Sequence, residues 1–209
     1  VIGAVVTDSL KRYVEAHPFV PKDKNTLDER CNEIFNIQTA ALAKRLGHMR
    51  NRSGKDPRVT IGVSGGLDST LALIVAARTF DMLGIPRTNI LGYTMPGYGT
   101  TARTKGNAHA LMKELGITAR EVDIRKACLA QMQDEGYKPF GIDLTGLDVD
   151  TFSAKLVAMQ DAVGAAGGEL KDLYFENVQA RMRTKILMDN GFVIGTGDLS
   201  ELAKGWCTY

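Results

Sequence analysis

Two spacings of hydrophobic residues alternate along the chain, and together they predict its secondary structure. Short, largely apolar runs, typical of buried strands, occur at 59–63, 89–94 and 192–195, and a further strand is predicted at 118–122. Between these runs, helix-like apolar stretches occur at 71–76, 103–115 and 175–188. The first of these is apolar all round, which predicts direct packing on a sheet. Because strands and helices alternate, we expect an α/β fold with a doubly wound parallel sheet and helices on both faces.

A longer helix is predicted near the N-terminus. Thr26, with Glu29 three residues later, has the form of a capping box, and the helix is expected to end at Gly47. Its apolar face would consist of Cys31, Ile34, Phe35, Gln38, Leu42 and Leu46. A short helical stretch around 7–15 and a proline-containing connector at 17–21 precede it. We therefore predict a linker and amphipathic helix over 1–50 and an α/β domain over 51–209.

Two segments fit this pattern poorly. Between residues 135 and 168, glycines and a proline interrupt the periodicity, and only 152–159 has the form of a short helix, so we interpret this stretch as an insertion or mobile lid. Farther along, only Asp189, Asn190 and Gly191 join the helix over 175–188 to the last predicted strand. An Asn-Gly pair can cap a helix, but so short a connection also suggests that residues are missing here.

Composition narrows the class of protein. The 209 residues suit one domain of ordinary size with appendages. With 26 Lys and Arg against 24 Asp and Glu, the net charge of +2 gives no argument for a nucleic-acid or membrane partner. The three cysteines and three histidines have no metal-ligand spacing. No apolar run approaches the roughly 20 residues of a membrane span, and no signal peptide is evident, so we expect a soluble cytoplasmic protein.

The most informative motif is Gly62-Val63-Ser64-Gly65-Gly66-Leu67-Asp68-Ser69-Thr70, which leads from a predicted strand into a predicted helix. Gly65 and Gly66 have no Cβ, so the backbone can approach a bound anion, and the first free amides of the helix point at it. The segment lacks the Gly-Lys-Ser/Thr ending of a Walker loop. A carboxylate beside phosphate oxygens would repel them unless Mg²⁺ lay between, so Asp68 is predicted to be a metal ligand. The competing interpretation is an ordinary strand-to-helix turn.

A second motif, 196–201, follows the last predicted strand. Because the carboxyl ends of neighbouring parallel strands lie side by side, Asp68 and Glu201 could approach one cation, and Glu201 is predicted to be the second Mg²⁺ ligand. The competing interpretation is that Thr196, Asp198 and Glu201 only cap a helix.

A third motif places Asn177 and Arg181 four residues apart, on one face of a helix. The planar guanidinium of Arg181 could clamp phosphate oxygens. The alternative is a charged face in contact with solvent.

These motifs resemble those of known enzymes. Ser64-Gly65-Gly66-Leu67-Asp68-Ser69 resembles the pyrophosphate-binding loop of the N-type ATP pyrophosphatases, which use ATP to adenylate an oxygen and release pyrophosphate. Together with 95–100, 176–183, 195–201 and 205–209, it resembles the synthetase domain of ammonia- or glutamine-dependent NAD synthetases. The resemblance implies an adenine nucleotide alpha hydrolase-like, Rossmann-like fold.

The resemblance also implies roles for individual residues. The ATP phosphates would be held by Gly62, Val63, Ser64, Gly65, Gly66, Leu67, Asp68 and Ser69, with Arg181 and Thr196 as further ATP contacts. Deamido-NAD would contact Asn177, Glu201, Trp206, Cys207, Thr208 and Tyr209. Asp68 and Glu201 would hold Mg²⁺, and with Arg181 they would be the catalytic residues. The implied reaction is ATP-dependent amidation of deamido-NAD to NAD through an adenylate, with release of AMP and pyrophosphate and with ammonia as the nitrogen source.

The same resemblance raises expectations about the intact protein. Ammonia would come free or from a glutaminase domain, which is absent here, and 18–21 and 30–35 resemble the connector that follows it. The family continues past Tyr209 and usually has more residues near 189–191. Because the chain begins at Val1 rather than Met, we expect a fragment, and because it stops at Tyr209 we expect it to be truncated at its C-terminus. We further expect a homodimer or higher homo-oligomer.

Two alternatives to this function stay open. Another adenylating enzyme with the same loop, such as a GMP synthetase or a tRNA-modifying enzyme, accounts for the first motif but not for the other two. A tRNA partner would also favour a basic stripe, and the nearest candidate is the polar loop region 45–58. A nucleotide-sensing module that binds ATP without turnover is the second alternative, but it has no need of two acids placed for catalytic magnesium.

Overall fold

The computed structural model describes residues 12–15, 17 and 20–205, and it divides into two compact units, Val1–Gln38 and Thr39–Tyr209. In the first unit, residues 13–15 are not helical, and the remainder of the predicted helix at 7–15 lies almost wholly outside the described residues. Helix α1 (Lys24–Ser53) begins in this unit and continues into the second. None of the described helices is both long and apolar enough to cross a membrane.

The predicted long helix exists, but both of its predicted ends are wrong. Its N-terminus is capped by Asp23, whose Oδ2 accepts hydrogen bonds from the backbone N and Oγ1 of Thr26 at 2.8 and 2.9 Å. Thr26 therefore lies inside the first turn instead of capping it. At the other end the helix continues through Gly47 to Ser53, since a single glycine weakens a helix without ending it.

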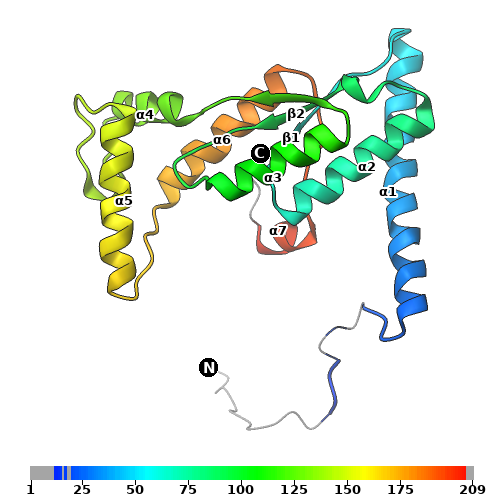
Figure 1. The fold of residues 1–209 in the computed structure, drawn as a ribbon, viewed down its shortest axis with the longest axis horizontal. Coiled ribbons are helices and arrows are strands. Elements are labelled where there is room, and N and C mark those ends of the chain that lie inside the picture. The colour runs from blue at the N-terminus through cyan, green and yellow to red at the C-terminus, as the bar shows by residue number, and fades with distance from the viewer. Residues whose placement is uncertain (1–11, 16, 18–19, 206–209) are drawn as a thin grey trace, which may run out of the picture. The chain divides into compact units, whose positions relative to one another are not determined.

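Four parallel strands form the sheet of the second unit (Figure 1). Strands β1 (Val59–Gly62), β2 (Ile90–Thr94), β3 (Thr118–Glu121) and β4 (Phe192–Val193) lie in the order β3-β2-β1-β4. Val59 pairs with Ile90 on one side and with Phe192 on the other. The parallel sheet is thus confirmed, although β4 has two residues where four were predicted.

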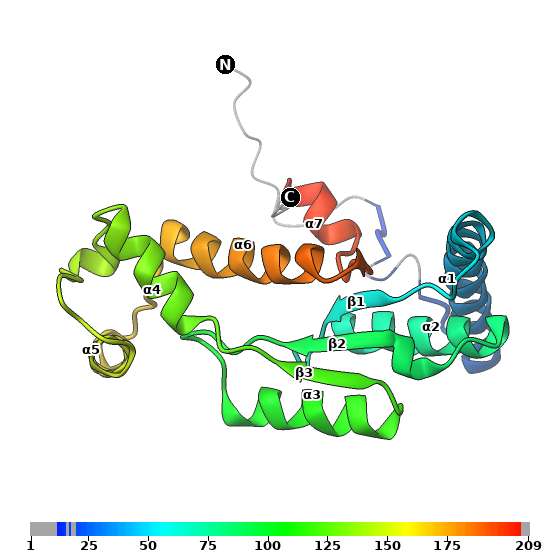
Figure 2. The ribbon, with the colours of Figure 1, turned by 90° about the horizontal axis from the view of Figure 1, so that it is seen from above.

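Helices cover both faces of this sheet, as expected for a doubly wound fold. The helices of the second unit are α2 (Leu67–Leu83), α3 (Ala102–Glu114), α4 (Arg125–Asp134), α5 (Val149–Ala165), α6 (Leu173–Asp189) and α7 (Leu199–Lys204), with 3-10 turns η1 (Arg87–Asn89) and η2 (Pro139–Gly141). Figure 2 shows α3 and α6 on opposite sides of the strands.

The alternating side chains of the strands supply one core to each face. Ile90 packs with α2 and α3, whereas its neighbours Leu91 and Tyr93 join the core formed with α4, α5 and α6. On α2 only one side is buried, because Leu71 and Ile74 remain 46% and 39% exposed. The predicted direct packing of this helix on the sheet is confirmed, since Leu73, Ala76 and Phe80 share a core with strand residues, but its outer side is exposed.

The segment 135–168 is also different from its prediction. It contains η2 and the whole of α5, and it follows helix α4, which has no counterpart among the predicted elements. Phe152 and Leu156 of α5 are buried, and the Phe152 ring lies 4.9 Å from that of Tyr98 in an edge-on contact. Its side chains complete the second core, which argues against a mobile lid, while the interpretation as an insertion stays a prediction.

Asp172 fastens this segment to α6. Its Oδ1 caps α6 at the backbone N of Phe175 and accepts from the hydroxyl of Tyr137, while Oδ2 accepts from the backbone N of Phe140, at 3.0, 2.8 and 3.0 Å. Phe140 has a φ of 52°, so this hydrogen bond helps to hold its backbone in the left-handed conformation.

Replacing Asp172 with alanine is expected to lower the free energy of unfolding by about 2–4 kcal/mol, because three hydrogen bonds to a charged acceptor disappear. Asp148→Ala is the matched control, since Asp148 caps α5 through one exposed bond and its removal should cost about 1 kcal/mol. Denaturant unfolding of both variants measures the difference. Equal losses would show that the two extra bonds of Asp172 contribute nothing.

Candidate active site

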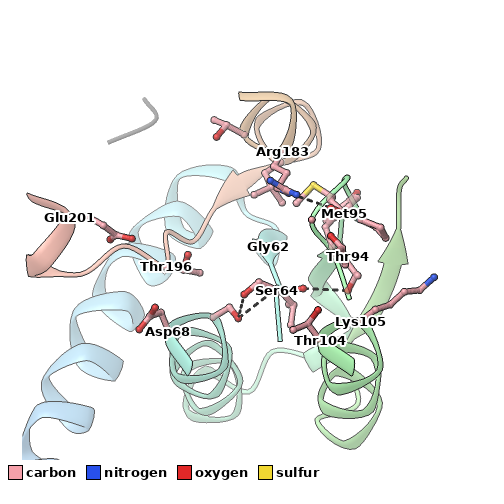
Figure 3. A pocket seen from close by; sticks show the side chains of 18 residues that line it. Gly62, Ser64, Asp68, Thr94, Met95, Thr104, Lys105, Arg183, Thr196 and Glu201 are labelled. Carbon is pink, nitrogen blue, oxygen red and sulfur yellow. Dashed lines mark hydrogen bonds between the residues drawn. The ribbon is translucent and has the colours of Figure 1, made fainter. Parts of the chain in front are cut away.

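A cavity of about 470 Å³ lies at the carboxyl ends of β1 and β2 (Figure 3). Parallel sheets of this kind place their ligands at this edge. Its walls come from the β1–α2 loop, the β2–α3 loop, the start of α3, the C-terminal half of α6 and the segment leading into α7. The lining residues are Gly62, Val63, Ser64, Asp68, Ser69, Tyr93, Thr94, Met95, Pro96, Gly99, Thr100, Thr104, Lys105, Arg183, Thr184, Leu187, Thr196 and Glu201.

The two-glycine loop is held in shape by its own hydroxyls. Ser69 Oγ accepts from the backbone N of Ser64, lies 3.1 Å from Ser64 Oγ and donates to the carbonyl of Gly66. Ser64 Oγ in turn accepts from the backbone N of Gly66 at 3.2 Å. Gly65 has a φ of 81°, and a Cβ there would lie 2.3 Å from the carbonyl oxygen of Thr104. The loop thus needs glycine both for its conformation and for its close contact with α3.

Helix α2 begins at this loop without a side-chain cap, because its N-cap residue is Gly66. Helix α4 likewise has no side-chain cap at its N-cap residue, whereas α3, α5, α6 and α7 are capped by the side chains of Thr101, Asp148, Asp172 and Asp198. The first amides of α2 therefore remain available at an edge of the cavity, where a helix N-terminus favours an anion. This arrangement favours the phosphate-site interpretation of the loop over an ordinary turn.

The two acids predicted to share a cation both line the cavity. Figure 3 shows Asp68 and Glu201 on the side of the cavity away from Met95 and Lys105, with Thr196 beside them. The carboxylate of Asp68 forms no hydrogen bond with another described residue, whereas Glu201 Oε2 accepts from the backbone N of Asp198 at 2.6 Å.

This bond belongs to a full capping box, in which Asp198 also accepts from the backbone N of Ser200 and Glu201. The two interpretations of the second motif are therefore compatible, since Glu201 caps α7 through one oxygen and faces the cavity. No group of three or more His, Cys, Asp or Glu side chains in the described part of the chain is placed to hold a metal ion by itself.

The third motif differs most from its prediction. Arg181 is exposed, and neither it nor Asn177 is among the residues that line the cavity. Arg183 does line it, is half-buried, and donates from Nε to the carbonyl of Met95 at 3.3 Å. Burial lowers the pKa of Arg183 below its ordinary value.

Arg183 could have been found from the helical periodicity. It lies four residues after Gln179 and eight after Phe175, and these two residues are buried on the inward face of α6. The four-residue spacing between Asn177 and Arg181 shows that they lie on one face of α6, but it does not show which face of the helix packs against the sheet.

Lys105 and Thr104 are further lining residues that the motifs did not indicate. Lys105 reaches away from the cavity (Figure 3) and its Nζ pairs with Glu121 at 2.6 Å. His109 Nε2 lies 2.8 Å from the other oxygen of the same carboxylate. Hydrogen bonds from Lys105 and His109 hold the pKa of Glu121 below its ordinary value. This cluster lies on α3 and the edge strand β3, beside the cavity.

Comparison with known proteins adds to this geometry. The family model described as NAD synthase matches residues 39–145, just over half of the chain. The chain belongs to the NAD synthase family. The predicted family resemblance is thereby confirmed, and the match covers β1, β2, β3 and both loops that line the cavity.

Curated relatives in this family are much longer than the chain. A glutamine-dependent NAD(+) synthetase of Mycobacterium leprae is 44% identical over 206 residues, which cover 96% of this chain and 26% of the relative. Another, from Thermotoga maritima, is 31% identical over 189 residues, with 88% and 26% covered. The chain thus spans about a quarter of the length of these relatives.

Solved structures of similar proteins share the fold. The glutamine-dependent NAD+ synthetase of Acinetobacter baumannii, solved with adenosine diphosphate, has a TM-score of 0.58 at 26% identity and is matched over 84% of this chain and 28% of that one. The NH3-dependent NAD synthetase of Campylobacter jejuni has a TM-score of 0.54 at 19% identity, over 83% and 61% of the two chains. The second likeness supports the fold alone, which agrees with the predicted nucleotide-hydrolase-like α/β architecture.

Proposed function

We propose that this chain forms the ATP-binding synthetase part of an enzyme that amidates deamido-NAD to NAD, a ligase that forms a carbon–nitrogen bond. The observation that carries the proposal is the uncapped two-glycine loop of α2, which shares one cavity with the carboxylates of Asp68 and Glu201. The names of the relatives, glutamine-dependent NAD(+) synthetases, support the reaction, and the nucleotide in the Acinetobacter structure supports use of ATP.

In the proposed reaction, a carboxylate oxygen of deamido-NAD attacks the α-phosphorus of ATP, and the bond to pyrophosphate breaks. Ammonia then attacks the acyl carbon of the adenylate, AMP leaves, and the attacking nitrogen gives up a proton as the amide forms. The loop 62–69 and the amides of α2 would bind the phosphates and bring the α-phosphorus to the carboxylate. No side chain is required as a nucleophile.

Asp68 and Glu201 would hold Mg²⁺ beside the phosphates. The donor set fits this ion, because Mg²⁺ bound with a nucleotide commonly uses one or two protein carboxylates together with phosphate oxygens and water. Asp68 is free of other described partners, and Glu201 keeps one oxygen outside the capping box. When bound, the ion would neutralise charge on the departing pyrophosphate.

Several expectations remain proposals about the intact protein. Thr196 lies in the cavity as an ATP contact would, whereas Arg181 and Asn177 lie outside it. The proposed deamido-NAD contacts Trp206, Cys207, Thr208 and Tyr209 lie outside the described residues. A glutaminase domain as the source of ammonia, a homodimer or higher homo-oligomer, and the division of the chain at residues 50 and 51 also belong to the proposal.

The test is to incubate the protein with ATP, Mg²⁺, ammonium and deamido-NAD and to measure AMP and NAD. We expect both products to appear in equal amounts and only when all four components are present. AMP formed only with XMP or with tRNA would instead favour another adenylating enzyme with this loop. ATP binding without AMP under any of these conditions would favour a nucleotide-sensing module.

A further inference from the structure

A second cavity, of about 360 Å³, adjoins the first. It is formed by the β2–α3 loop, η2, α5, the start of α6 and the residues before it, and it is lined by Tyr98, Gly99, Thr100, Phe140, Leu156, Gln160, Leu170, Phe175, Glu176, Gln179 and Arg183. Gly99, Thr100 and Arg183 line both cavities. These three residues therefore form the boundary across which ligands in the two cavities would meet.

Arg183 is a cation without a counter-ion at this boundary. The guanidinium forms one hydrogen bond to a described residue, from Nε to the carbonyl of Met95, and no described carboxylate pairs with it, Glu176 included. Arg87 and Arg125, by contrast, each pair with an aspartate at 2.6 Å. The neighbouring thiol of Cys128 does not balance the charge, because burial raises its pKa to about 11. A half-buried, unpaired guanidinium is unfavourable unless a ligand supplies the missing negative charge.

The position of Arg183 is fixed by the loop that it contacts. Gln179, which is buried, accepts a hydrogen bond from the backbone N of Tyr98 at 2.9 Å and donates to the carbonyl of Phe175 at 3.3 Å. A Cβ at Gly97 would lie 2.4 Å from Gln179 Oε1 and 2.8 Å from an Nη of Arg183. Glycine thus allows the loop to lie directly against both side chains of α6.

Thr100 supplies a second polar group at the boundary. Its Oγ1 accepts from the backbone N of Gly97 at 3.0 Å, which orients the hydroxyl, and among the described residues it donates to none. The hydroxyl proton is therefore available to a ligand oxygen.

We propose that Arg183 and Thr100 form an oxyanion-binding subsite at the junction of the two cavities, with Gln179 as a positioning residue that holds the loop. The ligand class is a phosphoryl group or a carboxylate, either of which accepts two parallel hydrogen bonds from a guanidinium. The proposed function is needed only to say which molecule would supply this group. The phosphoryl group would be that of ATP in the first cavity, and the carboxylate that of deamido-NAD.

The test measures equilibrium binding of inorganic pyrophosphate, ATP with Mg²⁺, deamido-NAD and NAD to the protein and to Arg183→Gln. Arg120→Gln is the matched control, since it makes the same change at an exposed position that lines neither cavity. We expect Arg183→Gln to weaken binding of pyrophosphate or of one substrate by about 10- to 100-fold, and Arg120→Gln to change it less than about twofold. Arg183→Lys keeps the charge but loses the planar fork, so it should show an intermediate loss and serves if the Gln variant is unstable.

The ligands separate the two sources. A loss for pyrophosphate and ATP indicates the phosphoryl group. A loss for deamido-NAD that is absent for NAD, which has an amide in place of the acid, indicates the carboxylate. Thermal unfolding shows whether the two Arg183 variants are folded. The subsite is disproved if both folded variants bind all four ligands as tightly as the unmodified protein does. If the product assay fails but Arg183→Gln still weakens pyrophosphate binding, the proposed function is wrong and the subsite stands.

Discussion

Replacing Asp68 with asparagine is expected to remove most of the effect of Mg²⁺ on ATP binding. In the unmodified protein, the carboxylate repels the phosphates unless the ion lies between them, so Mg²⁺ should tighten ATP binding by about 10- to 100-fold. In the variant only Glu201 remains to hold the ion, so Mg²⁺ should tighten ATP binding less than about threefold, and binding in a metal chelator should become tighter than in the unmodified protein. AMP formation should fall on the order of 10³-fold, because charge on the departing pyrophosphate is no longer neutralised in place.

Titration calorimetry with ATP, in Mg²⁺ and in a metal chelator, measures the affinity under both conditions and so the size of the Mg²⁺ effect. Asp134→Asn makes the same substitution at an exposed position outside the cavity and should leave both affinities unchanged. A Mg²⁺ dependence as large in Asp68→Asn as in the unmodified protein would show that Asp68 does not hold the ion. Glu201→Gln separates the two roles of Glu201, since glutamine keeps a carbonyl oxygen for the α7 cap but loses the charge that would hold Mg²⁺.

Gly65→Ala is expected to have the second large effect. The new Cβ would lie 2.3 Å from a backbone oxygen, the carbonyl of Thr104, which can move only if α3 moves. The left-handed φ of 81° adds roughly 1 kcal/mol for alanine. The loop must therefore change shape, and we expect ATP binding to weaken by at least about 100-fold and the free energy of unfolding to fall by about 3 kcal/mol.

Gly54→Ala separates the effect of the left-handed φ from that of the contact with Thr104, because Gly54 has a similar φ of 64° but nothing within 4 Å of an added Cβ. This control should lose about 1 kcal/mol of stability and no ATP affinity. Binding and denaturant unfolding of both variants give the comparison. If the two glycine variants behave alike, the contact with Thr104 is not what determines the shape of the loop.

Sequence patterns were sufficient for the sheet and for the first loop, because both depend on local features. The apolar run at 59–63 and the glycines that follow it determine a strand, a turn and a helix start within a dozen residues. The alternation of elements then fixes the parallel sheet, and the sheet brings the two motifs that contain Asp68 and Glu201 into one cavity.

Features that depend on distant contacts could not be predicted in the same way. Helix α5 looked like a lid because glycines interrupt the segment before it, but Phe152 is buried against aromatic rings from other elements. The choice between Arg181 and Arg183 required knowledge of which side of α6 faces the sheet. That side is set by Phe175, Val178 and Gln179, whose burial is a property of the assembled core.

The absence of a side-chain cap on α2 has a thermodynamic consequence. Helices α3, α5, α6 and α7 carry their own hydrogen-bond acceptor, whereas the acceptor for the first amides of α2 would be a ligand oxygen. Because a ligand that binds only the folded state stabilises it in proportion to the logarithm of its concentration, the stability of this helix would vary with the supply of nucleotide. The start of α2 would thus be weakest when the protein has no nucleotide bound.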